Sequence, residues 1–377
     1  MSLTFIYSCK SDILRSKPAN EEEAFLQDHF SPDQKWGFLN KEGQLVIEDR
    51  YDDARDFSQS LAAVNYQGKW GYIDKSGETI VDYIYKEAHP FTGGFAIVRG
   101  MDDTWSVIDS LGSIKSNISA DRISIADRDI IKIQKNSMYG FLSISGDTLL
   151  KTQHSFATNF YDDYALVKYF NEYRLVSRQG KMTPLPYDKV FKISSNIYRI
   201  RKDKSYGYLA ETGTEVCKPS YSYASDFLDE MALVKEVDRY VLIDKQCRPV
   251  TSFSADYINM EYLGDGLVSF LENDLWGIIN VKEEIIAEPI YDMLYRPREG
   301  MLAFGIDDLW GFMDTKGNII TKAIFPLVWD YHEGLARVVY PEKAIGFIDK
   351  KGELVIPPYF YEIKDYYEGL ARVQIYR

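Results

Sequence analysis

The stretch KWGYIDKSG, residues 69–77, returns with small changes along almost the whole chain. Close copies are KWGFLNKEG at residues 35–43, LWGIINVKE at 275–283 and LWGFMDTKG at 309–317. The tryptophan position recurs about every 34 residues, and a fixed period of this size is the signature of a repeat architecture. Ten units therefore occupy residues 35–377, and residues 1–34 form a leader outside the pattern.

The tryptophan position anchors each unit, and a glycine follows it in the clearest copies. A tryptophan buries roughly 150–250 Å² of surface, so it can anchor a thin layer that is too small for its own core. The glycine removes a Cβ where another backbone or ring must approach closely. We predict these two roles for Trp36, Gly37, Trp70, Gly71, Trp105, Trp276, Gly277, Trp310 and Gly311. In the other units the anchor is Tyr139, Tyr173, Tyr206, Tyr240 or Ile345.

Two further landmarks repeat in phase with the anchor. An Asx-x-x-Gly segment follows it, as in Asp74 to Gly77, and its side-chain hydrogen bonds and tolerance of positive φ are typical of a tight hairpin turn. A Leu-Ala-x-Val-like strand lies near the end of each unit, as at residues 61–64 and 335–338. The segments between turns are short and rich in residues that favour strands. The sequence predicts an all-β fold, with helical periodicity only at residues 20–29.

The arrangement of the ten units is harder to predict. A unit of this length cannot bury its hydrophobic face alone, so neighbouring units must stack. We expect an open, curved, solenoid-like array, because propellers typically have about four to eight blades and residues 26–30 stand where a partner strand for the first unit is expected. The alternative is a β-propeller, either one large ring or two five-bladed rings, closed by pairing of the first Trp-Gly strand with the last Leu-Ala-Arg-Val strand.

These motifs resemble the WG-repeat family, also named KWG-repeat, of bacterial proteins. The resemblance rests on the KWG-[FY]-[LI]-[ND]-K-x-G pattern and the later Y-D and G-L-A-R-V segments, and it spans about nine tenths of the chain. It implies a repeat architecture and a bacterial setting, and it supplies no catalytic residues. Units 3 to 7 are degenerate: Ser106, Arg174 and Val241 stand where glycine is expected, and Cys247 replaces the turn glycine.

Charge indicates where a partner could bind. The net charge of −13 argues against general nucleic-acid binding, which needs a basic footprint. Residues 168–204, however, carry ten Lys/Arg against three acids. The candidate partner patch is Lys168, Arg174, Arg178, Lys189, Lys192, Arg199, Arg201 and Lys202. The structural alternative is that these cations merely protect strand edges from aggregation.

The three cysteines suggest no disulfide framework. Cys217 falls on a strand and Cys247 in a turn of the next unit, so they are not equivalent positions, and Cys217 is expected to be a small buried hydrophobe. Cys9 follows an apolar run and a small residue, as in a bacterial lipoprotein signal, and is a candidate for lipidation. A lipoprotein would sit on the cell envelope; without that anchor we expect a cytoplasmic protein.

No catalytic motif is found, and the sequence predicts neither an enzyme nor a cofactor or metal site. The repeated Asp74 and Asp314 are interpreted as turn formers, because metal ligands would need oxygen donors at several alternating positions. We expect a scaffold that presents an extended β-repeat surface to an acidic protein partner. One alternative is carbohydrate or cell-wall binding by exposed rings of Tyr66, Tyr295, Tyr331 and Tyr366. Another is a structural spacer on a bacterial envelope.

Overall fold

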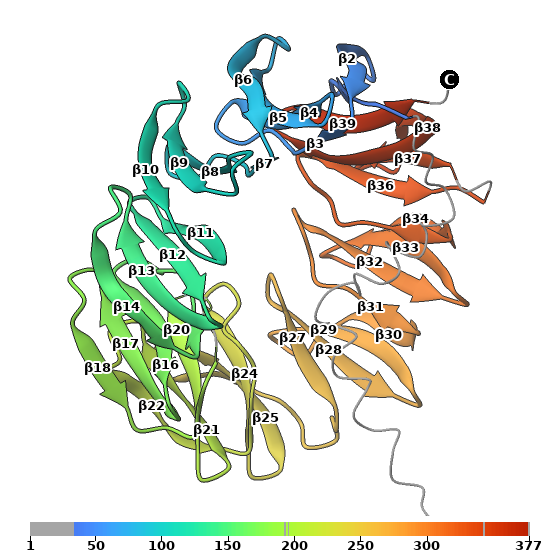
Figure 1. Cartoon of the computed structure of the whole chain (residues 1–377). Coiled ribbons are helices and arrows are strands. Elements are labelled where there is room, and N and C mark those ends of the chain that lie inside the picture. Colours follow the sequence, from blue (N-terminus) through green and yellow to red (C-terminus); the bar gives the residue numbers. More distant parts are fainter. Residues whose placement is uncertain (1–33, 192–193, 195, 342–343, 376–377) are drawn as a thin grey trace, which may run out of the picture. The chain divides into compact units, whose positions relative to one another are not determined.

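The computed structural model describes residues 34–377, except 192–193, 195, 342–343 and 376–377. Every regular element in this part of the chain is a β-strand (Figure 1), which confirms the all-β prediction. No helix that could cross a membrane is present among the described residues. The predicted helix at residues 20–29 and the candidate lipidation site Cys9 lie outside them. The chain divides into two compact units, Val46–Ser252 and the chain up to Leu45 together with Phe253–Arg377.

The repeated element is a blade of four antiparallel strands. In the first blade these are β3 (Asp53–Ala54), β4 (Leu61–Tyr66), β5 (Lys69–Asp74) and β6 (Thr79–Tyr85), in this order across the sheet. We name the strands of each blade A, B, C and D in chain order, and the turns AB, BC and CD. The Trp-Gly pair stands in strand C, and the Asx-x-x-Gly segment is the CD turn.

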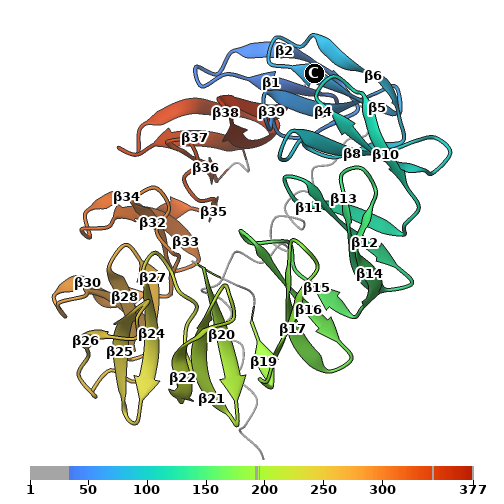
Figure 2. The same cartoon turned by 90° about the vertical axis from the view of Figure 1, so that its left-hand side faces the viewer.

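The compact unit Val46–Ser252 contains, besides blade 1, five further blades with the same strand order (Figure 2). Blade 2 has β7 (Glu87–Ala88), β8 (Phe95–Arg99), β9 (Trp105–Asp109) and β10 (Ile114–Ile118). Blade 3 has β11 (Arg122–Asp127), β12 (Ile130–Lys135), β13 (Met138–Ser143) and β14 (Thr148–His154). Blade 4 has β15 (Phe156–Ala157), β16 (Tyr164–Tyr169), β17 (Glu172–Ser177) and β18 (Met182–Leu185). Blade 5 has β19 (Lys189–Val190), β20 (Ile197–Lys202), β21 (Ser205–Ala210) and β22 (Glu215–Tyr221). Blade 6 has β23 (Tyr223–Ala224), β24 (Met231–Glu236), β25 (Arg239–Asp244) and β26 (Pro249–Ser252).

The second compact unit contains blades 7 to 10. Blade 7 has β27 (Met260–Gly264), β28 (Leu267–Glu272), β29 (Leu275–Asn280) and β30 (Ile285–Tyr291). Blade 8 has β31 (Met293–Leu294), β32 (Met301–Ile306), β33 (Leu309–Asp314) and β34 (Ile319–Phe325). Blade 9 has β35 (Leu327–Val328), β36 (Leu335–Val339), β37 (Ile345–Asp349) and the start of β38 (Leu354–Tyr367). Blade 10 has the end of β38, β39 (Leu370–Ile375), β1 (Trp36–Leu39) and β2 (Leu45–Tyr51), the strand in which the division between the units falls.

The open array predicted from the sequence is wrong, because the first and last strands pair. Strand β1 runs antiparallel to β39, with Trp36 opposite Gln374 and Leu39 opposite Ala371. The sequence repeat begins at strand C, so blade 10 takes strands C and D, which are β1 and β2, from the first copy and strands A and B, the end of β38 and β39, from the last copy. Left apart, both would present unpaired backbone groups, which are costly. The structure matches the alternative, a β-propeller: the described residues form ten four-stranded blades, and the first and last repeats are joined in blade 10.

The glycine after tryptophan accommodates a bulge in strand D. In blade 1, Trp70 pairs with Tyr85 but Tyr72 pairs with Val81, so strand D carries extra residues opposite Gly71. A Cβ on Gly71 would lie 2.5 Å from the carbonyl oxygen of Val81. This confirms the predicted close approach of a second backbone, and it explains why the anchor is followed by glycine.

Repeats without that glycine have a different strand D. Ser106, Arg174 and Val241 lie in blades 2, 4 and 6, whose D strands contain 5, 4 and 4 residues, against 7 in the bulged blades. In blade 4 the C and D strands pair in regular register, Arg174 with Pro184. Blades 3 and 5 keep the glycine, as Gly140 and Gly207, and also the bulge. From blade 1 to blade 6, blades with the glycine and its bulge therefore alternate with blades that lack both.

The core lies between consecutive blades, as the stacking prediction requires. Trp70 and Tyr72 of blade 1 pack in one cluster with Phe91 and Ala96 of blade 2. Trp36, Trp70, Trp105 and Trp310 are all buried, with Trp276 partly so. In the CD turns, Asp74 Oδ1 accepts the backbone N–H groups of Ser76 and Glu78, and Asp314 does the same for Lys316 and Asn318. These aspartates are turn formers, as predicted.

Candidate binding surface

The two ends of a blade carry different turns. Arg178, in the CD turn of blade 4, forms ion pairs with Asp163 of its own AB turn and with Asp129 in the AB turn of blade 3. AB and CD turns thus share one end of the blades. The BC hairpins lie at the opposite end, beside the crossovers between blades, where Asp52 accepts the N–H of Gly68. We name this second end the BC end.

The structure brings five of the eight predicted patch residues together at the BC end of blades 4 and 5. Lys189 and Arg201 are direct partners on β19 and β20, and Lys202 is the last residue of β20 before the BC turn. Lys168 and Arg174 flank the BC turn of blade 4. The two blades pack against each other through Leu166, Leu175, Tyr198 and Ile200 of a common core cluster.

The other three predicted residues do not belong to this surface. Arg199 is buried, at 7% exposure, because its guanidinium donates to the Ala224 carbonyl at 2.5 Å and pairs with Asp226 of blade 6. Arg337, at the equivalent position of blade 9, likewise pairs with Asp365 on the next blade. Arg199 is therefore an inter-blade clamp, and its assignment to the patch is wrong. Arg178 lies at the opposite end, and Lys192 lies outside the described residues.

Two apolar side chains stand at the tips of BC hairpins beside these cations. Phe170, in blade 4, is 78% exposed, and Val237, in blade 6, is 95% exposed. Both occupy the first turn position and have positive φ, 51° and 50°. The sequence interpretation missed them. Their position in the repeat could have revealed them, because the same position holds a polar residue in other repeats. These residues are Gln67, Asn136, Asp203, Asn273 and Asp307.

The AB/CD end of blades 3 to 5 is hollowed, with a volume of about 690 Å³. It is lined by Arg128, Asp129, Asp162, Asp163, Arg178 and Glu211. Arg178 is neutralised there by Asp127, Asp129 and Asp163. Partial burial, with the nearby carboxylates of Asp162 and Asp163, raises the pKa of Glu211. Across the described part of the chain, no group of three or more His, Cys, Asp or Glu is arranged to hold a metal ion.

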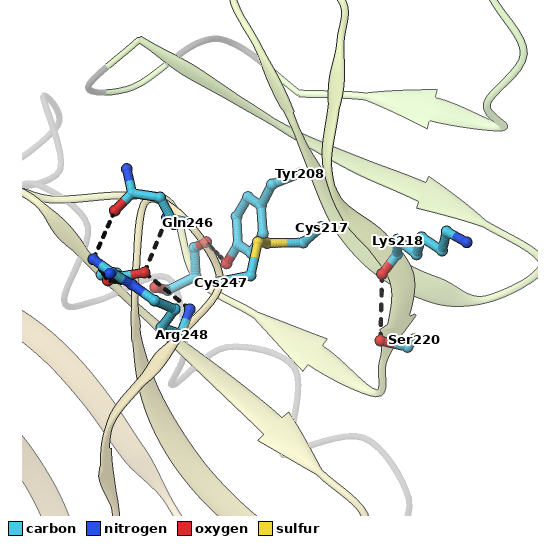
Figure 3. Close-up of a disulfide and its surroundings, with 9 residues drawn as sticks. Tyr208, Cys217, Lys218, Ser220, Gln246, Cys247 and Arg248 are labelled. Carbon is cyan, nitrogen blue, oxygen red and sulfur yellow. Dashed lines mark hydrogen bonds and ion pairs between the residues drawn. A yellow bond between two sulfur atoms is a disulfide. The ribbon is translucent and has the colours of Figure 1, made fainter.

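A disulfide joins blade 5 to blade 6, so the prediction of no disulfide is wrong (Figure 3). Cys217, the third residue of strand D in blade 5, bonds to Cys247 in the CD turn of blade 6, with Cα atoms 5.9 Å apart. The repeat geometry explains the pairing. The turn glycine of one blade faces the third strand-D residue of the blade before it, as Gly77 faces Ile47. Cys247 replaces that glycine, and Cys217 is the residue it meets.

The rings predicted for carbohydrate binding do not form an exposed row. Tyr295, Tyr331 and Tyr366 are buried, at 9%, 3% and 0% exposure, and only Tyr66 reaches 36%. The Tyr331 hydroxyl donates to the Asp349 carbonyl, and that of Tyr366 donates to the Asn40 carbonyl. These tyrosines serve the packing between repeats, which removes the observation on which the carbohydrate hypothesis depended.

Comparison with solved structures gives only distant similarity. A eukaryotic initiation factor is 12% identical, with 90% of this chain and 98% of that chain covered and a TM-score of 0.47. Hsv2 of Kluyveromyces lactis is 9% identical, with 62% and 94% covered and a TM-score of 0.33. BamB from Moraxella catarrhalis is 11% identical, with 90% and 91% covered and a TM-score of 0.32. No curated protein matches the chain by sequence.

The repeat itself is matched by a family model. The model described as WG containing repeat matches residues 36–70, 70–105, 276–310, 310–340 and 345–376. These segments include the best copies of the Trp-Gly pattern. The middle repeats, where the shorter D strands of blades 4 and 6 and the disulfide occur, are outside the matches. The resemblance found in the sequence is confirmed: these five segments of the chain match the WG containing repeat.

Proposed function

We propose that the protein is a non-enzymatic scaffold that binds an acidic segment of a protein partner at the BC end of blades 4 and 5. The observation that carries the proposal is the gathering of Lys168, Arg174, Lys189, Arg201 and Lys202 on one end of two adjacent blades. Among the described residues, Lys189, Arg201 and Lys202 form no ion pair, so their charge is available to a ligand.

The charge of the whole chain supports a protein rather than a nucleic acid as the partner. A net charge of −13 repels a polyanion at long range, whereas a local basic surface can still select an acidic segment through short-range complementarity. Repeat architectures commonly offer extended surfaces of this kind.

A charge-reversal experiment tests the proposal. The variant Lys189→Glu/Arg201→Glu/Lys202→Glu is compared with Lys282→Glu/Lys316→Glu/Lys322→Glu, which reverses three exposed lysines in the other unit. The probe is a fluorescent glutamate-rich peptide, and binding is followed by anisotropy at low and high salt. The first variant should lose binding by about tenfold or more and the second should keep most of it. Equal loss in both would make the binding a general charge effect and contradict the proposal.

We also infer that the scaffold works in an oxidising compartment, such as the bacterial envelope. The Cys217–Cys247 disulfide supports this, because such bonds persist in oxidising environments and are rare in the cytosol. The test is alkylation of the native protein in freshly lysed cells with a mass-tagged maleimide, with and without prior reduction. Tagging of Cys217 and Cys247 only after reduction supports the inference. Full tagging without reduction contradicts it.

A further inference from the structure

Phe170 and Val237 break the local rule that their hairpins follow. The first residue of each two-residue BC turn adopts a left-handed conformation, with φ of 52° at Gln67, 51° at Asn136 and 47° at Asp203. Polar residues with short side chains tolerate this conformation, and asparagine and aspartate are favoured at such turns. A β-branched valine or a bulky phenylalanine is disfavoured there.

Exposure adds a second disfavoured feature at the same positions. Phe170 and Val237 place 78% and 95% of their surface in solvent, so neither side chain contributes much hydrophobic burial to the fold. Both the backbone conformation and the exposure would improve with asparagine, as in blade 3. The Phe170 ring does meet the ring of its neighbour Tyr169, with centroids 4.6 Å apart, but at this exposure the contact buries little surface. A local conflict with so small a gain in the folded chain points to a contact made with something else.

The hairpin between these two tips is cationic. Blade 5 lies between blades 4 and 6, packed on the first through the Leu166–Tyr198 cluster and joined to the second by the disulfide. Figure 2 shows the strands of the three blades in this order. The BC hairpin of blade 5 presents Lys202, the last residue of β20, and Lys204, in the turn itself, and both are exposed. Along the BC end the chain therefore presents an apolar tip, a cationic hairpin and a second apolar tip.

Acidic residues interleaved with these cations favour a protein ligand over a membrane. Glu172 lies two residues after Phe170, Asp203 lies between the two lysines, and Asp238 follows Val237. An anionic lipid surface would be repelled by carboxylates at each hairpin, whereas a protein segment can place its own charges between them.

We propose that Phe170 and Val237 are apolar anchors for an extended protein segment in which acidic residues lie between two apolar side chains. The segment crosses blades 4 to 6, with its acids on Lys202 and Lys204 and its apolar side chains on the two tips. This rests on the proposed function and specifies the chemistry of the partner.

The test uses the full chain and two fluorescent peptides, one of glutamates alone and one with a leucine at each end of the glutamate run. The variants Phe170→Asn and Val237→Asn introduce the residue of blade 3, so they should fold with unchanged or raised Tm. Each single variant should bind the leucine-flanked peptide several-fold more weakly than the native chain, and the double variant about tenfold or more weakly. Asp307→Asn is the matched control, at the same turn position in the other unit.

The outcomes separate this inference from the proposed function. If both peptides bind equally and the double Asn variant changes neither, the anchors are refuted while the cationic site stands. If neither peptide binds, both proposals are refuted. Cosedimentation of the chain with vesicles of anionic phospholipid, lost in the double Asn variant, would overturn the assignment to a protein segment. Preferential, variant-sensitive binding of the leucine-flanked peptide supports the inference.

Discussion

Trp36 and Gln374 face each other on neighbouring antiparallel strands, although they stand near opposite ends of the chain. The indole is buried and the guanidinium of Arg372 lies 5.3 Å from its centre. The Tyr366 hydroxyl adds a hydrogen bond of 2.8 Å to the Asn40 carbonyl. The first Trp-Gly strand is thus completed by the last repeat, and the fold depends on this junction.

Removal of the last strand should therefore damage the first. A chain ending at Gly369 lacks β39, which exposes Trp36 and loses the burial of Leu370, Ala371 and Val373. At about 1.5–3 kcal/mol for each large apolar side chain, the loss should be at least about 3 kcal/mol. Thermal unfolding and size-exclusion chromatography measure the effect, and self-association through the free edge is expected. Unchanged stability would show that the junction is not needed. A chain ending at Ile375 is the control.

Gly71→Ala should be strongly destabilising because of the strand-D bulge. The new Cβ would lie 2.5 Å from the Val81 carbonyl oxygen, a backbone atom that cannot turn aside. We expect a loss of about 2 kcal/mol in the free energy of unfolding, measured by urea denaturation. Ser106→Ala, at the same repeat position in a blade of different strand-D pairing, adds no such clash. It removes only the 2.7 Å hydrogen bond to Asn117, so the free energy of unfolding should fall by only about 1 kcal/mol.

The disulfide should stabilise the junction of blades 5 and 6. Its cysteines are 30 residues apart in sequence, and a crosslink over a loop of this size contributes about 3–4 kcal/mol in the chain-entropy model. A reducing agent should lower the Tm of the native chain. The variant Cys217→Val/Cys247→Gly, with residues found at these positions in other repeats, should be insensitive to reductant. A native Tm that does not respond to verified reduction would contradict this prediction.

His154 should make stability depend on pH. The side chain is fully buried in strand D of blade 3, and burial lowers its pKa from the ordinary value of 6.5. The folded state thus favours the neutral ring. Its contribution is complete above about pH 6.5 and is lost as pH falls toward the lowered folded pKa, with a slope of at most about 1.4 kcal/mol per pH unit.

A series of Tm measurements from neutral to mildly acidic pH tests this sign. Tyr51 and Tyr221 occupy the same repeat position in other blades, so a tyrosine fits there. The variant His154→Tyr should therefore make the Tm less sensitive to acid. Tyr85→His creates a second buried imidazole in blade 1 and should increase it. If His154→Tyr leaves the pH profile unchanged, the loss arises from other groups.

Strands and turns could be predicted because each unit repeats the local pattern that forms them. Trp70, Gly71 and Asp74 have roles that their own neighbours determine, so the sequence is sufficient. Closure was mispredicted because the Trp-to-Trp frame starts at strand C, and a local pattern cannot tell which distant strand supplies the missing A and B.

The candidate surface was only partly predictable for a related reason. Counting charges located Lys189, Arg201 and Lys202, but it could not separate them from Arg199, whose partner Asp226 comes from the next blade. The cysteine pair was missed because Cys217 and Cys247 are not equivalent within one repeat. Instead, they occupy the two positions that meet between neighbouring blades, the turn glycine of one blade and the third strand-D residue of the blade before it. This contact is visible only in the folded structure.

The pairing of β1 with β39 has a consequence for synthesis. The strand that begins the series leaves the ribosome first, yet its partner is made after every other blade. Until β39 has been made, Trp36 cannot be buried and the backbone of β1 lacks its pairing partner. The nascent chain therefore exposes an unpaired, aggregation-prone strand edge during most of its translation. We therefore expect either that a chaperone shields this edge during synthesis or that pairing of β1 with β39 is a slow final folding step after release from the ribosome.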